Sequence, residues 1–583
     1  MIMNVLQSLL FSMSLLMIYI SSSIALPDRA CAPPHDKYPF CDVTLPREDR
    51  VNDLISRLEL DEKPYLLIAR ESPLGNISRL GLPAFDWGGN CIHGVQSECT
   101  ANGVCATSYP NPNALGATFN RTVWKGMGNT IGVELRAFYL LGVGEAHSSN
   151  LPPIGLDCWS PNINIVRDPR WGRNLETPGE SPYLNGQFGV EVTLGLQNGT
   201  LDERYMQAVV TLKHFDANSL EGPWGKDNEI TRHTVDANIS MYDLFETYLP
   251  AFRDSVVDGK AAGLMCSYNA VNGVPACASS FLLQDVLRGE WGFDGYVTSD
   301  SGAVKDILEN HHYTSNWNDT VKAAIEAGCD MESASWPKDH PWSTGGPYID
   351  YVPGVVRSGL MNESKLDDAL RHTLDLRFRL GLFDPVENQP FWNAISEKDI
   401  RSDEHQARAV DATEQSFVLL RNEKNTLPFK AGKRVLVTGP HADDRGAILG
   451  NYIGEICADA SYNCVKSPYE AIQAMNNASS GTTVLEPGCQ SVLSTNTSGF
   501  DAALSAAKNS DLIIFVGGLD TTVERESLDR HNVTLPGVRA REYLFSHSLT
   551  QRTYSSDTLI PLQFYVILNS NTNTRTQVRF RMY

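Results

Sequence analysis

Short apolar runs alternate with longer amphipathic stretches along the first two thirds of the chain. The runs rich in β-forming residues lie at 209–215, 263–269, 295–300 and 328–332. The amphipathic stretches, which we expect to be helices, lie at 241–258, 280–288, 302–310 and 319–327. Short strands that alternate with helices form βαβ units, so this pattern predicts a parallel sheet. Continued over residues 26–385, it predicts an α/β fold of the (β/α)8 TIM-like barrel type rather than an open sheet.

A second α/β segment follows a polar, charged connection at 386–412, which we interpret as a linker. Strands are expected at 416–420, 433–438 and 512–516, and helices near 469–475 and 500–508. This pattern again indicates a parallel sheet with flanking helices, in a second domain that begins near residue 413. More than one domain is expected in any case, because 583 residues are too many for one hydrophobic core.

The first 25 residues have the pattern of a signal peptide. A continuous apolar stretch at 9–20 is followed by three serines, and Ser23 and Ala25 suit cleavage after Ala25. No Lys or Arg precedes the stretch, so an uncleaved signal anchor is the alternative, although the stretch is short for a membrane span. We therefore expect a secreted, extracellular protein with no membrane contact once residues 1–25 are removed.

Sequons of the form Asn-x-Ser/Thr support export, because N-glycosylation marks surface positions of secreted proteins. They occur at Asn76, Asn120, Asn198, Asn238, Asn318, Asn362, Asn477, Asn496 and Asn532.

The 12 cysteines indicate an oxidising compartment, because several are spaced closely enough for small disulfide loops. The compatible pairs are Cys31 with Cys41, Cys266 with Cys277, and Cys457 with Cys464. The pairing within a cluster of three others stays open; these are Cys91, Cys99 and Cys105. A zinc site is the alternative use of the cysteines, but no CxxC spacing supports one.

The charge and the motifs exclude several other classes of protein. The net charge is −21, whereas a nucleic-acid-binding protein would show a basic stripe. No GxGxxG segment follows a strand, which disfavours a dinucleotide fold. We expect no cofactor and no metal ion, and the oligomeric state stays open.

Polar side chains follow the predicted barrel strands at their carboxyl ends, where barrels build their catalytic face. Lys213 and His214 end one strand, Tyr268 the next, and Asp300 the third. A cation, an imidazole, a phenol and a carboxylate at one mouth suit a hydroxyl-rich ligand. The alternative for Asp300 is an ordinary helix N-cap, because it directly precedes a predicted helix.

The loop at 159–183 combines three arginines with several Asn, Pro and Gly residues. Trp171 and Arg173, two positions apart, could supply an aromatic face and a multi-donor fork for a sugar. An ordinary surface loop with incidental arginines is the alternative interpretation.

Four stretches resemble the signatures of glycoside hydrolase family 3, specifically its β-xylosidase branch. They read PNINIVRDPRWGRNLETPGE, LKHF, MCSYNAVNGVPAC and GFDGYVTSDSGAV. Family members have a barrel followed by an α/β sandwich, so the resemblance implies the same fold here, with residues 413–537 as a partial α/β sandwich domain. It also implies that Asp300 is the nucleophile of a retaining β-glycosidase. The positions matching those that line the sugar subsite are Arg173, Lys213, His214, Arg232 and Tyr268.

A retaining mechanism requires a second carboxylic acid as acid/base. The resemblance places it in the sandwich domain, within the stretch GGLDTTVERESLDRHNVTLPG at 517–537. The family pattern puts the acid/base three residues before an Asp, here Asp529, which selects Glu526 over Glu524. The alternative is that both are solvated loop carboxylates.

The chain departs from the family pattern in two places. Xylosidases of the family carry a WWSEALHGV-like segment whose Glu contacts sugar hydroxyls, whereas this chain reads WGGNCIHGV with Asn90 at that position. The preference for xylose over glucose is therefore open. After Gly537 the sequence no longer resembles the family, so residues 538–583 are interpreted as an aberrant tail that leaves the sandwich sheet incomplete, with an exposed edge.

The expected function is release of β-D-xylose from the non-reducing end of xylan-derived oligosaccharides. A β-glucosidase or α-L-arabinofuranosidase-like activity within the same fold is one alternative. An inactive product, caused by the incomplete second domain, is the other. The family's β-N-acetylglucosaminidase branch is disfavoured, because Asp216 follows the KHF stretch in place of a PGHG-type segment.

Overall fold

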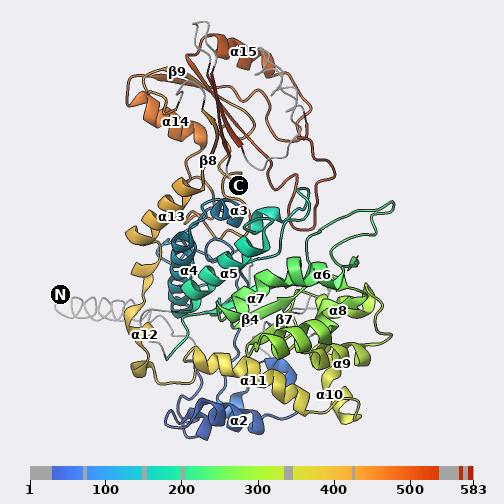
Figure 1. Ribbon diagram of the computed structural model, residues 1–583. Coiled ribbons are helices and arrows are strands. Elements are labelled where there is room, and N and C mark those ends of the chain that lie inside the picture. The colour runs from blue at the N-terminus through green and yellow to red at the C-terminus, as the bar shows by residue number, and fades with distance from the viewer. Residues whose placement is uncertain are drawn as a thin grey trace, which may run out of the picture.

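Two α/β units follow one another along the chain and lie below and above in Figure 1. The computed structural model describes residues 29–69, 75–146, 154–198, 204–333, 346–422, 427–537, 563–568 and 576–581. The expected signal peptide, residues 1–25, lies outside these ranges, so its cleavage stays a prediction. Within the described ranges, no helix is both long enough and apolar enough to cross a membrane.

The first unit is built on a parallel sheet in the order β1-β2-β4-β7. Its strands are β1 (Asp157–Cys158), β2 (Val209–Phe215), β4 (Gly263–Cys266) and β7 (Tyr296–Ser299). Every residue of these strands is buried, which explains why they read as continuous apolar runs. β4 and β7 end earlier than predicted, so Tyr268 and Asp300 lie in the loops just beyond the strand ends.

Isolated bridges of one or two backbone hydrogen bonds join the two edges of this sheet into a ring. Beyond β7, the Met331 amide donates to Val297, and the Ala69 amide donates to Glu332. The Trp87 amide donates to Ala69, and the segment at 87–89 then pairs with β1 through Gly89 and Cys158. Seven segments of the described residues therefore follow one another around the ring, four of them as the regular strands.

Helices pack around the ring as the alternating pattern predicts (Figure 1). They are α2 (Arg47–Arg57), α4 (Arg121–Leu141), α5 (Pro182–Gln197), α7 (Leu249–Val257), α8 (Ala303–Glu309), α9 (Trp317–Ala327), α10 (Pro347–Arg357) and α11 (Ser364–Arg379). Glycines allow α4 and α5 to approach closely, because a Cβ at Gly195 would lie 2.2 Å from the Lys125 carbonyl oxygen. The predicted helix at 280–288 forms a π-helical segment over Phe281–Glu290.

The connection predicted at 386–412 is largely helical. It contains α12 (Pro390–Ala394) and most of α13 (Asp403–Ser416). Ser402 caps α13, and His405 Nδ1 lies 2.8 Å from Glu134 Oε1 on α4. Few residues of α13 are buried, so its sequence is polar and lacks the apolar stripe by which a helix is predicted.

The second unit contains a six-stranded sheet in the order β10-β9-β11-β12-β13-β8. The strands are β8 (Val418–Asn422), β9 (Arg434–Thr438), β10 (Thr482–Leu485), β11 (Leu512–Gly517), β12 (Gln563–Leu568) and β13 (Thr576–Arg581). β9, β10 and β11 are parallel to one another. Helices α14 (Pro468–Asn477) and α15 (Phe500–Lys508) flank them, near the predicted positions.

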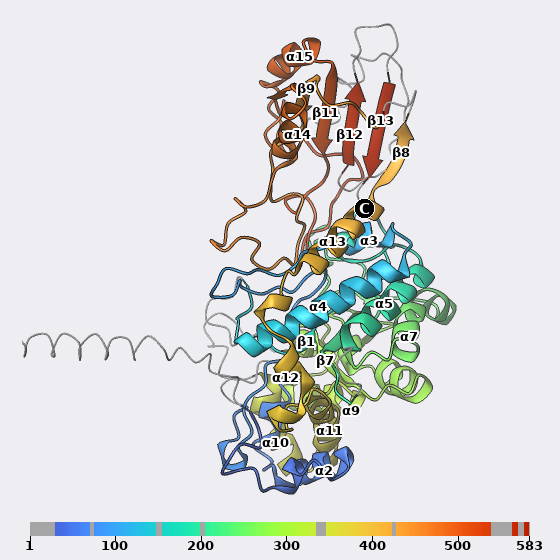
Figure 2. The same ribbon diagram turned by 90° about the vertical axis from the view of Figure 1, so that its left-hand side faces the viewer.

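The tail was expected to leave this sheet incomplete, with an exposed edge, whereas two of its segments form strands of the sheet. β12 pairs antiparallel with β11, and β13 joins β12 to β8, as Figure 2 shows in the upper part of the molecule. The edge of β11 is therefore covered. A strand edge accepts any extended backbone, so a segment unlike the family's continuation can still pair with it.

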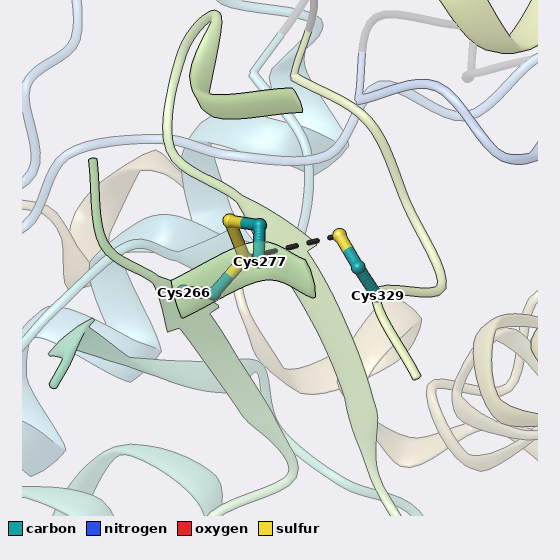
Figure 3. A group of neighbouring side chains, drawn as sticks. All are labelled: Cys266, Cys277 and Cys329. Carbon is teal, nitrogen blue, oxygen red and sulfur yellow. Dashed lines mark hydrogen bonds between the residues drawn. A yellow bond between two sulfur atoms is a disulfide. The ribbon is translucent and has the colours of Figure 1, made fainter. Parts of the chain in front are cut away.

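Five disulfides join ten of the 12 cysteines, and they include the three predicted pairs. The open cluster is resolved by Cys99–Cys105 and by Cys91–Cys158, the latter joining residues 67 apart. Figure 3 shows the free Cys329 beside the Cys266–Cys277 bridge, with 3.8 Å between the Cys329 and Cys266 sulfur atoms. A zinc ion would need thiolates, whereas two of these three sulfurs are joined to each other.

Candidate active site

Asp300 lies at the carboxyl end of β7, and its backbone amide donates to the Cys266 carbonyl at the end of β4. Asp300 as a whole residue is 8% exposed. Oδ1 accepts from the Ser301 amide, and Oδ2 is buried. The N-cap interpretation is wrong, because α8 begins at Ala303 with Gly302 as its cap. A hydrogen bond to Asp300 is among the influences that raise the pKa of Tyr268, so this carboxylate lies against the phenol.

His214 faces this oxygen, with its Nε2 atom 3.6 Å from Asp300 Oδ2. The Asn164 side-chain N–H donates to the His214 carbonyl, which makes Oδ1 the acceptor end of the Asn164 amide. This Oδ1 atom accepts from the His214 backbone amide and from the His214 Nδ1 atom. The proton therefore resides on Nδ1, and Nε2 presents a lone pair. Burial, reinforced by the nearby Arg173 and Lys213 charges, holds the pKa of His214 well below its usual value. The neutral ring can accept a hydrogen bond from a substrate hydroxyl.

Lys213 precedes His214 at the end of β2 and is 2% exposed. Burial, aided by the neighbouring Arg173 charge, lowers the pKa of Lys213 to about 8. Its Nζ atom donates to Asn90 Oδ1 at 3.3 Å and lies 4.6 Å from the centre of the Tyr452 ring. Asn90 therefore occupies the site in which the resemblance expected a carboxylate.

Arg173 is buried beside Lys213 and forms an ion pair with Glu176. Its Nη2 atom donates to Glu176 Oε2 at 2.8 Å and to the Tyr452 hydroxyl at 3.1 Å. Tyr452 belongs to the second unit, so the site is built from both. Trp171 does not offer an aromatic face to a ligand, because it is 1% exposed and its indole N–H donates to Glu221.

Glu526 enters the same cluster from the second unit. Its Oε1 atom accepts from Arg232 Nη1 at 2.6 Å, and Oε2 accepts from the Tyr452 hydroxyl at 3.0 Å. Arg232 also donates to Glu221 and covers the Tyr268 ring, 4.6 Å from the ring centre. The Asp300 and Glu526 charges both raise the pKa of Tyr268, although burial raises it most. All eight predicted site residues therefore lie in one connected cluster.

The two candidate acids have opposite electrostatic environments. Burial raises the pKa of Glu526, but the charges of Arg173 and Arg232 outweigh it and hold the pKa at about 2. Burial raises the pKa of Glu524 to about 7 despite the charge of Arg530, which donates to Glu524 at 3.0 Å. Glu524 lines a separate cavity with Asp444 and Asp520. The raised pKa of Glu524 therefore favours it as a proton donor, whereas the position of Glu526 among the other candidate site residues favours Glu526.

Asp529 holds the Glu526 loop against the first unit. One oxygen accepts from the Gly172 amide, and the other accepts from the amides of Glu221 and Gly222 and from the Trp224 indole. Gly172 must lack a side chain, because a Cβ there would lie 2.2 Å from the carbonyl oxygens of Arg525 and Leu528. The loop is therefore fixed by backbone contacts on both sides.

The pattern of residues did not identify Glu176, Glu221 or Tyr452 as part of the site. Glu176 lies within the loop at 159–183 that the composition had singled out. Glu221 and Tyr452 have no local signal, because only the fold brings them to Arg173 and Arg232.

Two family profiles match the chain. The glycosyl hydrolase family 3 N-terminal domain matches residues 57–376, and the family 3 C-terminal domain matches residues 417–547. The chain belongs to glycosyl hydrolase family 3. The second match runs ten residues past Gly537, so family likeness extends into the segment interpreted as an aberrant tail.

Several named family 3 relatives are similar over most of the chain. Probable beta-D-xylosidase 7 of Arabidopsis thaliana is 37% identical over 543 residues, which cover 90% of this chain and 65% of the relative. An exo-1,4-beta-xylosidase of Emericella nidulans is 37% identical and covers 86% of this chain and 62% of the relative. A beta-xylosidase/alpha-L-arabinofuranosidase of Medicago sativa is 36% identical, with 86% and 60% covered. The chain thus spans less than two thirds of each of these relatives.

Solved structures of glycosidases have the same fold. An exo-beta-xylosidase in complex with a xylobiose aziridine probe superposes with a TM-score of 0.77 at 32% identity, covering 90% of this chain and 64% of that one. A beta-glucosidase from Listeria innocua in complex with isofagomine gives a TM-score of 0.69 at 25% identity, covering 86% and 67%.

Proposed function

We propose that the protein is a secreted, retaining, exo-acting β-glycosidase that releases β-D-xylose from xylan-derived oligosaccharides. The observation that carries the proposal is the joint placement of Asp300 and Glu526. The charges of both carboxylates act on the same four groups, Lys213, Arg232, Tyr268 and Tyr452, and the two carboxylates come from different units. In keeping with family 3, we assign the closed ring of the first unit to the (β/α)8 TIM-like barrel class.

The reaction proceeds by two displacements. Asp300 Oδ2 attacks the anomeric carbon while the bond to the leaving oxygen breaks and that oxygen takes a proton from Glu526. Water then attacks the glycosyl ester and gives a proton to the Glu526 carboxylate, and the bond to Asp300 breaks. Each displacement inverts the carbon, so the product keeps the β configuration.

The first step requires a proton on Glu526, which the surrounding cations oppose. With a pKa of about 2, Glu526 is an anion near neutral pH and is ready to act as the base of the second step. Glu526 must therefore take up its proton against the charges of Arg173 and Arg232 before the leaving group departs.

Exo action agrees with the gradient of burial across the site. The groups suited to sugar hydroxyls, Lys213, His214 and Arg173, are almost completely buried. The Glu526 side chain is 41% exposed. A terminal sugar held on the buried side would leave the rest of the oligosaccharide on the exposed side, next to the acid.

Secretion is supported by the apolar segment at 9–20 and by the positions of the sequons. The sequon asparagines other than Asn120 are exposed, so they are accessible to glycosylation. Asn120 is half-buried and caps α4 by accepting from the Thr122 amide.

The second candidate is a β-glucosidase or α-L-arabinofuranosidase activity, favoured by Asn90. An amide in place of a carboxylate loses charge-assisted bonds to sugar hydroxyls, and with them part of the discrimination between sugars. Hydrolysis of aryl β-xyloside, β-glucoside and α-L-arabinofuranoside by the purified protein would rank the three.

Proton NMR of the first-formed sugar tests the retaining mechanism. We expect β-xylose to appear first and then mutarotate. Early appearance of the α-anomer would contradict the proposed pairing of Asp300 with Glu526. Absence of turnover on all three aryl substrates by the folded protein would support the inactive alternative.

A further inference from the structure

His233 lies next to Arg232 in sequence and contacts groups on three sides. Its Nδ1 atom is 2.7 Å from Asp306 Oδ2, and Arg232 Nε lies 3.3 Å from its Nε2 atom. A guanidinium has no acceptor, so Nε2 must accept from Arg232 and the proton must reside on Nδ1, where it is donated to Asp306. The two partners together define one neutral tautomer.

Arg232 is thereby held at both ends of its guanidinium. Nε donates to His233, while Nη1 donates to Glu526 at 2.6 Å and to Glu221 at 3.2 Å. The His233 ring also lies 4.3 Å from the Tyr268 ring, which the guanidinium of Arg232 covers. Loss of the Nε contact would let the guanidinium turn away from Glu526.

Asp306 anchors this arrangement to the element that carries the nucleophile. It lies on α8, which directly follows Asp300, and is 4% exposed. Its other oxygen accepts from Asn310 Nδ2 at 2.5 Å. A continuous set of contacts therefore runs from α8 through His233 and Arg232 to Glu526.

We propose that His233, held by Asp306, is a positioning residue that keeps the Arg232 guanidinium against Glu526. This inference rests on the proposed role of Glu526 as acid/base. Four other groups face Glu526 or its partners: Arg173 and Lys213 as cations, Tyr452 as a hydrogen-bond donor, and Glu221 through Arg232. Removal of His233 should therefore weaken, but not abolish, the stabilisation of the Glu526 anion.

The test compares His233→Phe with His233→Gln. Phenylalanine keeps a ring beside Tyr268 but neither hydrogen bond. Glutamine can keep both, because its amide oxygen accepts from Arg232 and its amide nitrogen donates to Asp306. We expect the Glu526 carboxyl to titrate about one unit or more higher in His233→Phe, a tenfold change in proton affinity, and to titrate as in the wild type in His233→Gln.

Titration of ¹³C-labelled glutamate followed by NMR, with the signal assigned through Glu526→Gln, measures this directly and needs no activity. The basic limb of the kcat/KM profile for a substrate with a poor leaving group should move in the same direction. An unchanged Glu526 titration in folded His233→Phe would overturn the inference. If the NMR titration of Glu526 changes but the pH dependence of kcat/KM does not, the role of His233 is supported and Glu526 is rejected as the acid/base.

Asp306→Ala provides an independent variant, because it removes the anchor and leaves His233 in place. Asp306→Ala should raise the pKa of the Glu526 carboxyl, as His233→Phe does. If it does not, while its thermal midpoint stays close to that of the wild type, His233 does not depend on Asp306 and that part of the inference is wrong.

Discussion

At the scale of single residues, the carboxyl groups of the site differ in what surrounds them. Asp300 lies at a strand end with its Oδ1 atom bound to the Ser301 amide, Glu526 is partly exposed and pairs with Arg232, and Glu524 shares a buried ion pair with Arg530. These environments assign the three carboxyl groups different chemistry, although all lie in acidic or polar loops of the sequence.

Replacement of Asp300 tests its role as the nucleophile. Asp300→Asn keeps the shape of the side chain but cannot form the glycosyl ester, so we expect turnover of an aryl β-xyloside to fall at least about a thousandfold, or about 4 kcal/mol of barrier. Steady-state assays with matched thermal melts measure this. Near-normal turnover by the folded variant would falsify the assignment.

Glu526→Ala should affect substrates according to their leaving groups. Poor leaving groups need protonation, whereas activated aryl groups need little, so only the former should lose most of their glycosylation rate. Added azide should restore turnover by intercepting the glycosyl enzyme without a general base. The matched control is Glu524→Gln, since alanine would leave the buried Arg530 unpaired. Azide rescue in Glu524→Gln instead would reverse the assignment.

Asp216 predicts a dependence of stability on pH. Burial raises its pKa to about 7, and its Oδ2 atom accepts no hydrogen bond from the described residues. An unfolded Asp has a pKa of about 3.9, so the folded protein holds a proton that the unfolded chain releases. The protonated Asp216 side chain therefore makes its full contribution to the free energy of unfolding below about pH 4. This contribution is lost as the pH rises through about 7, because the buried carboxyl must then ionise.

At pH 8, Asp216→Asn should therefore have a higher melting temperature than the wild type. The free energy of unfolding should increase by an amount on the order of 3 kcal/mol. The difference should shrink or reverse at pH 4. Asp157 and Glu332, whose pKa values burial raises to about 6 and about 8, act in the same direction, so some slope should remain. A difference that grows towards acid pH would contradict the prediction.

At the scale of elements, the second sheet depends on strands far apart in sequence. β9, β10 and β11 form its parallel part, while β12 and β13 connect β11 to β8. The segment that carries Glu526 directly follows β11. The order of the sheet therefore bears on the position of the acid/base.

Proline at Val566 tests whether β12 is needed. Val566 pairs with Ile514 of β11, and proline cannot serve as a donor inside a sheet. We expect Val566→Pro to lower the melting temperature, increase binding of a hydrophobic dye and reduce activity, while Val566→Ala has a much smaller effect. Equal behaviour of the two variants would mean that the tail does not stabilise the sheet.

At the scale of the whole molecule, the active site exists only when the two units are together. The first unit carries Asp300 and the buried sugar-binding groups, and the second supplies Tyr452 and Glu526. Asp529 accepts four hydrogen bonds from the first unit, more than any other acid in the Glu526 loop accepts from it.

Asp529→Ala should loosen the junction, because it leaves four donors without their acceptor. We expect at least about a tenfold loss of kcat/KM for poor leaving groups, with a smaller loss for activated ones, since Glu526 is displaced and Asp300 is not. Asp520→Ala is the control, because Asp520 pairs with His441 inside the second unit. Equal losses for both kinds of substrate would indicate general unfolding instead.

The sequence by itself determined the α/β class, most strands and helices, the three short disulfide loops and the residues at the strand ends. These depend on local periodicity and on residue types, which a single chain displays directly. Asp300, Lys213 and His214 could be located because polar residues that directly follow an apolar strand point to the catalytic face.

Only the tertiary structure decided the partners of those residues. Cys91–Cys158, the contacts of Tyr452 and Glu221, and the pairing of β12 with β11 join segments with no local relation in sequence. The opposite pKa shifts of Glu524 and Glu526, two positions apart, follow from burial and from which arginines lie beside each. Burial and long-range charge arise from packing in three dimensions, so no local pattern reports them.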